Sequence, residues 1–540
     1  MRILLSSPFK PFGIDGKYGR KEALAEIFHN QLTLTQGAFS IRNFTTSNAL
    51  HVIANNIDTP TTVLDCPTLN HYIKEIRNDY DIIGISAQLP NFNQLKKMLG
   101  VTRQYAPKSR IVVGGFVAAI PDIKDQIDAD DICKGEGIGF MRNLLGLPPE
   151  YSYQNPRSIF SETKEIFGVP VIGLKRPLMV VGLGCTYGCD FCSTSHFFGK
   201  KHIKLIRSGK ELFNEIIFLN RKYPDATIGC VGDDNFLVDL ERAEELRTCL
   251  IQSGQAVKLY IFASADRIVE FGIEKLAETG VDIVWIGRES KYAGYRKNQS
   301  VDCKALIAEM KKYGIKPIMS SMLLVDAHSK ENIYDDIDDH IAGKPVFSQF
   351  LFYTPTPGTP LYQRFLLEGR INTELTYEDY NGRNASLVIH PAFSSREARQ
   401  IQDDAYYRDF EQLGPSLVRY IETDFTGWLH LKDSGKSILR ARAETYARKM
   451  GRYRTLLYAI ALLSSSQQHK EMCNAVRRRI ESSFGKITIN EKAIARGLFF
   501  AGSIREARTR RWGDSMQPSS YKFYFNQGRS DNVIMKRLLF

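Results

Sequence analysis

The sequence has no apolar run long enough to cross a membrane. A spanning helix needs roughly 18 or more consecutive apolar residues, and the most apolar stretch, residues 456–463, is far shorter. The N-terminal segment MRILLSSPF lacks the apolar core and the cleavage site of a signal peptide. We therefore expect a cytoplasmic protein without a transmembrane segment, whose first residues form a strand. Peripheral contact with a membrane stays open.

Cysteine is too scarce and too uneven for a disulfide framework. There are nine cysteines in 540 residues, an odd number, and no signal peptide accompanies them. Six of them are scattered singly and are expected to be small buried core residues, namely Cys66, Cys133, Cys230, Cys249, Cys303 and Cys473. The other three lie close together, which singles out their segment for a chemical role.

Acidic residues are moderately fewer than basic residues. The chain has 72 Lys and Arg against 60 Asp and Glu, a net charge of +12. The densest basic stretches come late, at residues 477–479 and 505–511, and we interpret them as solvated helical faces. Weak contact with an anionic substrate or a membrane is the alternative. No nucleic-acid partner is expected.

The pattern of apolar segments predicts an α/β protein with several domains. Residues 1–150 alternate strands with helices, which predicts a doubly wound, Rossmann-like or flavodoxin-like parallel sheet. Residues 147–176 contain four prolines, at 148, 149, 156 and 170, and residues 151–176 are interpreted as a linker. Residues 177–370 alternate again, in six strand–helix pairs, as in a partial (β/α)6 TIM-like barrel. Residues 371–540 are mainly helical, and their end, from about Gln517, is expected to be a loosely held tail.

The three clustered cysteines follow a predicted strand at residues 178–182. Cys185, Cys189 and Cys192 have the spacing C-x3-C-x2-C, with glycines that let the chain wrap a compact inorganic core. Thiolates suit a cubane iron–sulfur cluster, and three ligands for four irons leave one iron open. A zinc site with His196 as the fourth ligand is the alternative, although this is not a usual zinc-finger spacing.

This segment, GLGCTYGCDFCSTSHFFGK, has the aromatic Phe191 just before its third cysteine. It resembles the signature of the radical S-adenosylmethionine superfamily, over about residues 177–370. The resemblance implies a [4Fe–4S] cluster on Cys185, Cys189 and Cys192. It also implies that S-adenosylmethionine chelates the open iron and is cleaved reductively to a 5′-deoxyadenosyl radical.

Further positions along the predicted barrel agree with the family pattern and follow the cysteine segment in the family's order. They come at the ends of successive strands, where barrel enzymes place their chemistry. The resemblance implies contacts to S-adenosylmethionine from Asp233, Asp234, Ser264, Glu289 and Ser290. Asp233-Asp234 stands where some relatives have Gly-Glu, so the contact to the amino group stays open. The segment TPTPGTP at 354–360 is similar to a turn common in the superfamily.

The N-terminal domain resembles the cobalamin (B12)-binding domain of B12-dependent radical enzymes. The matching segments are YDIIGIS at 80–86, RIVVGGFVAAIP at 110–121 and KGEG at 134–137. Ligands of such sheets lie beyond the carboxyl ends of the strands. The implied contacts to cobalamin come from Ser86, Gly114, Gly115, Phe116, Gly135 and Glu136. The D-x-H-x-x-G loop that supplies a histidine to cobalt is absent, which leaves the lower axial ligand open.

The two resemblances together imply the cobalamin-dependent, class B methyltransferase-like subgroup. Its reaction is methylation of an unactivated carbon or phosphorus of a small-molecule or peptide substrate, with flavodoxin or ferredoxin as an electron donor. A cyclase, ring-modifying or oxidising enzyme without methyl transfer is the first alternative. A methylthiotransferase would need further cluster cysteines before residue 150, where only Cys66 and Cys133 occur. A non-catalytic corrinoid- or metal-binding regulator is the alternative from another class.

Overall fold

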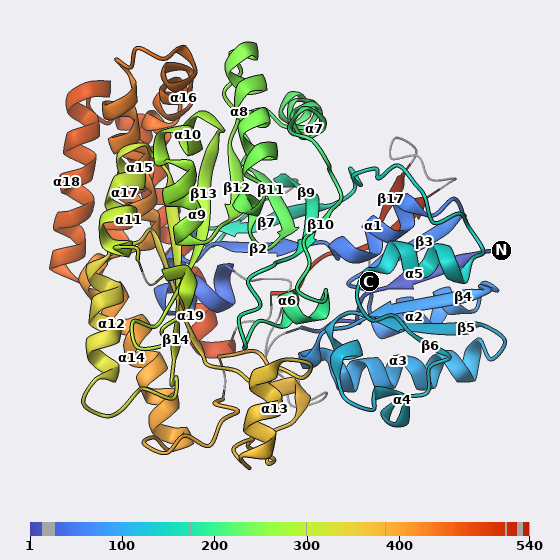
Figure 1. The fold of residues 1–540 in the computed structure, drawn as a ribbon. Coiled ribbons are helices and arrows are strands. Elements are labelled where there is room, and N and C mark those ends of the chain that lie inside the picture. The colour runs from blue at the N-terminus through green and yellow to red at the C-terminus, as the bar shows by residue number, and fades with distance from the viewer. Residues whose placement is uncertain are drawn as a thin grey trace.

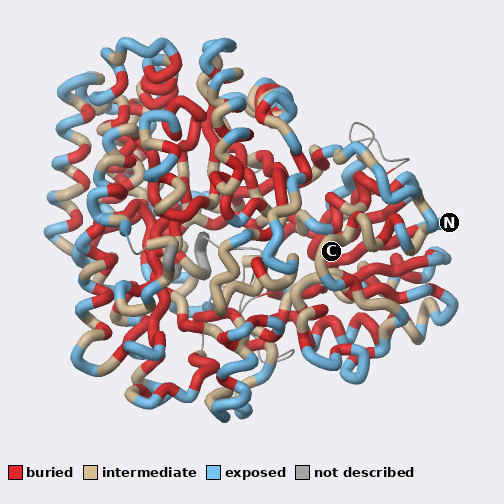
Figure 2. Tube along the Cα trace, viewed as in Figure 1, coloured by how far each residue is buried: buried red, intermediate tan, exposed pale blue. Residues whose placement is uncertain are grey.

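The protein, described here from a computed structural model, contains two β-sheets and a layer of C-terminal helices (Figure 1). The structure describes residues 1–12, 28–171, 174–298, 300–383, 385–513, 516–525 and 533–538. Buried residues are concentrated along the strands of both sheets and on the helix faces that cover them (Figure 2). None of the described helices has the length and apolarity that crossing a bilayer requires.

The first sheet is built around five parallel strands in the order β3-β1-β4-β5-β6. In chain order this is 2-1-3-4-5, the arrangement of flavodoxin-like doubly wound sheets. The strands are β1 (Ile3–Ser6), β3 (Thr61–Asp65), β4 (Ile82–Ser86), β5 (Arg110–Gly114) and β6 (Asp131–Ile132). The connecting helices are α1 (Asn48–Asn56), α2 (Leu69–Ile76), α3 (Phe92–Tyr105), α4 (Ile123–Gln126) and α5 (Gly137–Leu144).

Alternating side chains of these strands bury two opposite faces. Leu4, Ile83 and Ile85 pack in one cluster with side chains of α2 and α3. Ile3 and Leu5 pack in another cluster, with Leu50 of α1 and Met141 of α5. This two-residue period is what a sheet covered by helices on both faces requires.

The end of the chain completes the first sheet. Strand β16 (Ser520–Phe525) pairs antiparallel with β3, and β17 (Ile534–Leu538) pairs with β16. The prediction of a loosely held tail is therefore wrong for these strands. Alternating Tyr521, Phe523 and Phe525 are buried against the sheet, and this burial holds the hairpin in place.

The second sheet is a curled half-barrel. Six parallel strands lie in the order β15-β14-β13-β12-β11-β9, and β7 and β2 extend the β9 edge in antiparallel orientation. Residues 151–176, predicted as a linker, contain β7, β8 and the start of β9. The strands are β2 (Arg42–Thr45), β7 (Phe160–Ile166), β8 (Val169–Pro170), β9 (Lys175–Gly184), β10 (Ile203–Lys204), β11 (Ile228–Asp233), β12 (Leu259–Phe262), β13 (Val281–Glu289), β14 (Lys316–Leu323) and β15 (Phe347–Phe352).

Helices cover the outside of the half-barrel and continue into the C-terminal layer. Those of the barrel are α6 (Ser193–Phe197), α7 (Gly209–Lys222), α8 (Leu240–Ser253), α9 (Ala265–Phe271), α10 (Ile273–Glu278), α11 (Cys303–Lys312), α12 (Ile333–Ala342) and α13 (Pro360–Leu367). The C-terminal layer consists of α14 (Ser395–Leu413), α15 (Ser416–Leu431), α16 (Ser437–Ala447), α17 (Met450–Leu463), α18 (Gln467–Phe484) and α19 (Ile489–Trp512).

A buried ion network joins the amino ends of the barrel strands to these helices. Lys316, at the start of β14, pairs with Asp282 of β13 at 2.6 Å and with Asp424 of α15. All three side chains are fully buried. Burial alone would raise the pKa of Asp282, but Lys316, together with Lys449, holds that pKa well below its ordinary value. The network therefore fixes the C-terminal helices to the end of the barrel opposite the strand carboxyl ends.

Replacing Lys316 by Met should destabilise the protein by about 3–5 kcal/mol near neutral pH, because two buried carboxylates lose a partner. A carboxyl group with a lowered pKa contributes its stability above the unfolded pKa of about 4 and loses it as the pH falls. The deficit of Lys316→Met should therefore shrink in acid. Urea unfolding of Lys316→Met and of the unmodified protein, at pH 7.5 and at pH 4, measures this difference in the free energy of unfolding. Lys312→Met, at an exposed lysine, is the control and should not shift the midpoint.

Candidate functional site

The cysteine loop lies at the carboxyl end of β9 and leads into α6. Cys185, Cys189 and Cys192 are all half-buried in it. The turn into the loop needs glycine at position 184, where φ is +78° and a Cβ would collide with the carbonyl oxygen of Lys201. The three thiols are therefore presented at the end of the parallel strands, where barrel enzymes carry their active sites.

Asp190, between the second and third cysteines, anchors the loop to the far side of the half-barrel. Its carboxylate accepts a hydrogen bond from the Tyr295 hydroxyl at 2.8 Å and another from the Tyr353 hydroxyl at 3.1 Å. Phe191 packs edge-on against the same two rings, with its centroid 5.1 Å from that of Tyr295. Because Tyr353 follows β15 and the loop follows β9, these contacts tie the two ends of the parallel run together.

The start of α6 fixes the loop from the inside. The Ser195 hydroxyl donates to the carbonyl of Cys185 at 2.7 Å, and the Ser195 N–H points at the sulfur of Cys192 at 3.5 Å. His196 directs Nε2 at the carbonyl oxygen of Cys189, 3.1 Å away. A carbonyl only accepts, so this nitrogen donates and is not directed at a metal. Within the described residues, no three or more His, Cys, Asp or Glu side chains converge as ligands of one metal ion.

Burial and a nearby lysine act in opposite directions on the pKa values of the three thiols. Burial raises the pKa of each, that of Cys192 to about 11, while the cation of Lys297 acts in the opposite direction on all three. Lys297 also pairs with Glu289 at the end of β13. Glu289 is a non-glycine residue with φ of +63°. Such backbone strain is found mainly where a side chain must be aimed, and it directs this carboxylate into the half-barrel.

The two aspartates after β11 take different places. Asp233 is fully buried and pairs with Arg242 at 2.6 Å and with His202 at 3.2 Å. Asp234 faces a cavity and is exposed to it. Burial by the surrounding protein and the negative charge of Asp233 raise the pKa of Asp234 to about 7. Of this predicted pair, only Asp234 therefore faces the cavity.

The two serines predicted as site residues, Ser264 and Ser290, form hydrogen bonds to other groups of the protein. The Ser264 hydroxyl accepts from the Asn235 amide at 2.9 Å and contacts the Tyr187 hydroxyl, which links β11, β12 and the cysteine loop. Ser290 contacts His328 and accepts a hydrogen bond from the N–H of Tyr292. It follows directly after β13 and lines a different cavity from Glu289. Neither serine lines the two cavities described next.

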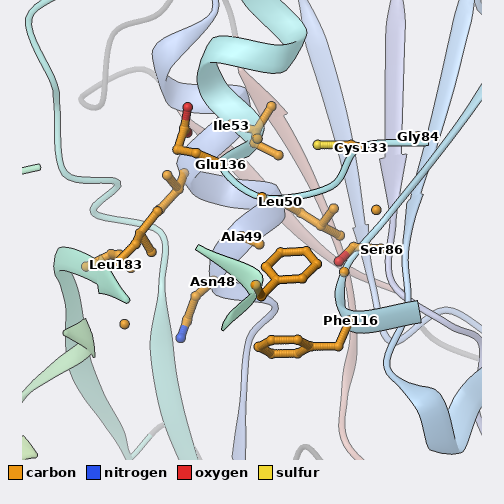
Figure 3. A pocket seen from close by; sticks show the side chains of 18 of the residues that line it. Asn48, Ala49, Leu50, Ile53, Gly84, Ser86, Phe116, Cys133, Glu136 and Leu183 are labelled. Atoms are coloured by element: carbon orange, nitrogen blue, oxygen red, sulfur yellow. The ribbon is translucent and has the colours of Figure 1, made fainter. Parts of the chain in front are cut away.

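The first cavity, of about 290 Å³, lies between the carboxyl edge of the first sheet and the half-barrel (Figure 3). The six residues predicted for the N-terminal domain all line it, namely Ser86, Gly114, Gly115, Phe116, Gly135 and Glu136. Gly115, with φ of +84°, packs so closely on Ala87 that a Cβ would collide with the Ala87 carbonyl oxygen. The carboxylate of Glu136 instead caps α5, where it accepts from the N–H groups of Ile138 and Gly139.

The opposite wall of this cavity comes from the cysteine segment itself. Phe197 and Phe198, at the end of α6, line it together with Thr194, and the ring of Phe197 packs 4.9 Å from that of Phe116. Phe116 also lines a second cavity of about 370 Å³ inside the half-barrel, as does Gln88. The two cavities therefore meet at Gln88 and Phe116.

The second cavity is lined by polar and apolar side chains, among them one carboxylate, that of Glu289. Glu289, Ser320 and Gln349 come from the inner side of the barrel strands, and Phe191 of the cysteine loop closes one end. The Ser320 hydroxyl accepts from the Trp285 indole and donates to Gln349 at 2.6 Å. This chain of hydrogen bonds holds the polar groups of the cavity in fixed directions.

The sequence alone does not reveal several of these residues. Lys297 and the two tyrosines at 295 and 353 belong to no predicted motif. Asp190 lies inside the cysteine segment, but its partners are more than 100 residues away in the chain. Only the strand order brings them together. Lys297 follows the predicted Glu289 and Ser290 within ten residues, but this spacing gives no direction for its side chain.

No family model matches the chain. Among curated proteins, an uncharacterized methyltransferase of Pyrococcus horikoshii is 22% identical over 366 residues, which cover 61% of this chain and 78% of the relative. The bacteriochlorophyllide d C-8(2)-methyltransferase of Chlorobaculum tepidum is 22% identical over 338 residues, or 58% and 73% of the two chains. Cytidylyl-2-hydroxyethylphosphonate methyltransferase of Streptomyces wedmorensis is 27% identical over 142 residues, 26% of each chain. These similarities support an enzyme that transfers a methyl group.

Removing the Asp190 anchor should loosen the cysteine loop. In metal-free protein, Asp190→Ala should increase the rate at which a thiol reagent modifies the loop cysteines by about tenfold, because two hydrogen bonds to a carboxylate are lost. Mass spectrometry of the labelled peptide measures the rate. Asp404→Ala removes a similar carboxylate–tyrosine contact, 2.8 Å from Tyr334, and should leave the rate unchanged. Equal rates in Asp190→Ala and the unmodified protein would contradict the anchoring role.

Proposed function

We propose that this protein is a cobalamin-dependent radical S-adenosylmethionine methyltransferase, acting on an unactivated carbon or a phosphorus of its substrate. The observation that carries the proposal is the position of the cysteine loop. Three thiols at the carboxyl end of β9 lead directly into α6, which forms a wall of the cavity at the edge of the first sheet. Two cofactor sites would thus share one wall.

The donor set fits a [4Fe–4S] cluster with one open iron. Cys185, Cys189 and Cys192 would hold it, since they come from one loop and are half-buried. Backbone N–H groups of Tyr187 and Ser195 favour the ionised form of Cys185 and Cys192, and Lys297 offsets part of the negative charge. When bound, such a cluster supplies the electron that cleaves S-adenosylmethionine. The protein's own residues orient the loop, through the hydrogen bonds of Asp190 and Ser195, and shield its thiols partly from solvent.

The first cavity fits a planar, largely apolar group with polar edges. Leu50, Ile53 and Leu183 provide apolar surface, and Figure 3 shows Ser86 and Phe116 together at its rim. A corrinoid held there would supply a methyl group. Ser86 is the hydroxyl that the chain offers to it, and Gly114 leaves room for close approach. No histidine occurs among the described residues that line the cavity, so none of these supplies an imidazole to the cobalt.

The substrate and S-adenosylmethionine would share the second cavity. Its polar side chains are held in place by hydrogen bonds, and Glu289 is the carboxylate that reaches it from β13. The junction at Gln88 and Phe116 is where a methyl group would pass from one cavity to the other. At this junction the ring of Phe116 packs against that of Phe197. The two rings would keep water away from the transferred group. The named relatives support methyl transfer, on a pigment in one case and a phosphonate in another.

An electron donor would approach from the outer side of the loop. There, Cys189 lines an open cavity of about 640 Å³ together with Asp266, Arg267 and Lys297. The stem of Lys200 lies over Gly188 of the loop. A small donor such as flavodoxin or ferredoxin is the partner we propose for this side. The two cavities, which we assign to the corrinoid, the substrate and S-adenosylmethionine, occupy the inner side of the loop.

Replacing Cys185, Cys189 and Cys192 together by Ala should abolish 5′-deoxyadenosine formation and the iron–sulfur absorbance after anaerobic reconstitution. The thiols are not part of a core cluster, so the fold should persist. Cys249→Ala, at a half-buried cysteine of α8, is the matched control and should retain both signals. Full 5′-deoxyadenosine formation in the triple variant would refute the radical assignment.

Filling the first cavity should remove the corrinoid and leave the cluster. Ser86→Tyr places a ring in the cavity, and the corrinoid absorbance after reconstitution with cobalamin should fall at least about tenfold relative to Ser86→Ala, which keeps the cavity open. Iron content and 5′-deoxyadenosine formation should stay similar in both variants.

The mass of the product distinguishes methyl transfer from the alternative reactions. A methylated product with S-adenosylhomocysteine supports methyl transfer, whereas a product without added methyl supports the cyclase or oxidase alternative.

A further inference from the structure

Helix α19 presents an unusual outer face. Its inner side packs on α17, where Gly502 lies against Leu463 and Ala495 is fully buried. Its outer side exposes large apolar side chains to solvent within the described part of the chain. These are Ile489 (85% exposed), Ile494 (59%), Phe500 (62%), Ile504 (59%) and Trp512 (69%). Single exposed apolar residues are ordinary, but several on one helix face indicate a surface that is covered by something.

The same helix is strongly basic. It carries six Lys or Arg side chains against two glutamates. Both glutamates are engaged, since Glu491 pairs with Arg454 and Glu506 pairs with Arg510. Arg508 and Arg511 are exposed in the last turns, beside Ile504 and Trp512. The outer face therefore combines apolar side chains with an excess of positive charge, because the six cations of the helix outnumber its two glutamates.

A neighbouring turn extends this face. The tip between β7 and β8 touches α19, because Gly168 lies against the backbone of Ala501 and the stem of Arg505. Arg505 also pairs with Glu165 of β7 at 2.8 Å. On either side of the tip, Ile166 and Val169 are each 36% exposed. The apolar surface thus continues from the helix onto the adjacent hairpin.

We propose that the outer face of α19, with the β7–β8 tip, is a docking surface for an anionic lipid bilayer. A helix with apolar and aromatic side chains flanked by Arg lies readily at the boundary between headgroups and acyl chains. The negative surface of an anionic leaflet complements its charge. A second copy of this chain fits less well, since a symmetric contact would bring two basic faces together. This inference does not depend on the proposed function.

The test is cosedimentation of the full-length protein with large unilamellar vesicles. One set contains phosphatidylcholine alone and the other contains about 30% phosphatidylglycerol. We expect binding to the anionic vesicles only, with loss of binding at high salt, because surface charges are screened. The emission of Trp512 should shift to the blue on binding, and this shift should be absent in Trp512→Phe. Equal binding to both vesicle types, or none to either, would overturn the proposal.

Variants separate the apolar and the charge contributions. Phe500→Ser combined with Ile504→Ser should weaken vesicle binding by about tenfold or more, and Arg508→Glu with Arg511→Glu should do the same at low salt. Leu367→Ser, at an 88% exposed leucine of α13, is the control and should bind like the unmodified protein. All these side chains are exposed, so thermal unfolding should be unchanged. If light scattering instead shows a dimer that the Phe500/Ile504 variant dissociates, a second copy covers the face and the proposal is wrong.

Discussion

The carboxylate of Asp190 is the contact on which the arrangement of the site depends. The contacts of Ser195 and His196 hold the cysteine loop from the inside, but they do not reach across the half-barrel, which is open on one side. The two tyrosine hydroxyls on Asp190 connect the loop after β9 to the strand end after β15. This contact therefore ties the loop that carries the thiols to the far end of the run of parallel strands.

The two sheets meet through their carboxyl edges, and this explains why both cavities lie where they do. In each sheet, parallel strands leave their ends, and the loops that follow, on one side. With the sheets facing each other at α6, the residues after β4, β5 and β6 and those after β9 and β11 line one space. The ion network around Lys316 fixes the C-terminal helices to the opposite end of the barrel, so that end is closed by packing.

Much of this fold follows from sequence patterns. The strand predicted at 178–182 lies within β9, since an apolar run bounded by turn residues specifies it locally. The six residues predicted for the N-terminal domain do line the first cavity, because each ends or follows a strand of one sheet. What the sequence could not indicate is the direction of a side chain and the pairing of strands distant along the chain: Asp233 turns to Arg242 while Asp234 faces the cavity. Likewise Glu136 caps its own helix, and strands β2 and β16 join sheets far from their chain neighbours.

The hairpin of β16 and β17 has a consequence for how the chain is made. Strand β3 is formed from residues 61–65, yet the strand that covers its outer edge is residues 520–525. During synthesis on the ribosome, that edge stays open while more than 450 further residues are added. An open strand edge invites pairing with other chains. The newly made N-terminal half therefore needs protection until its last strands arrive, and a chain truncated before Ser520 would be released with this edge uncovered.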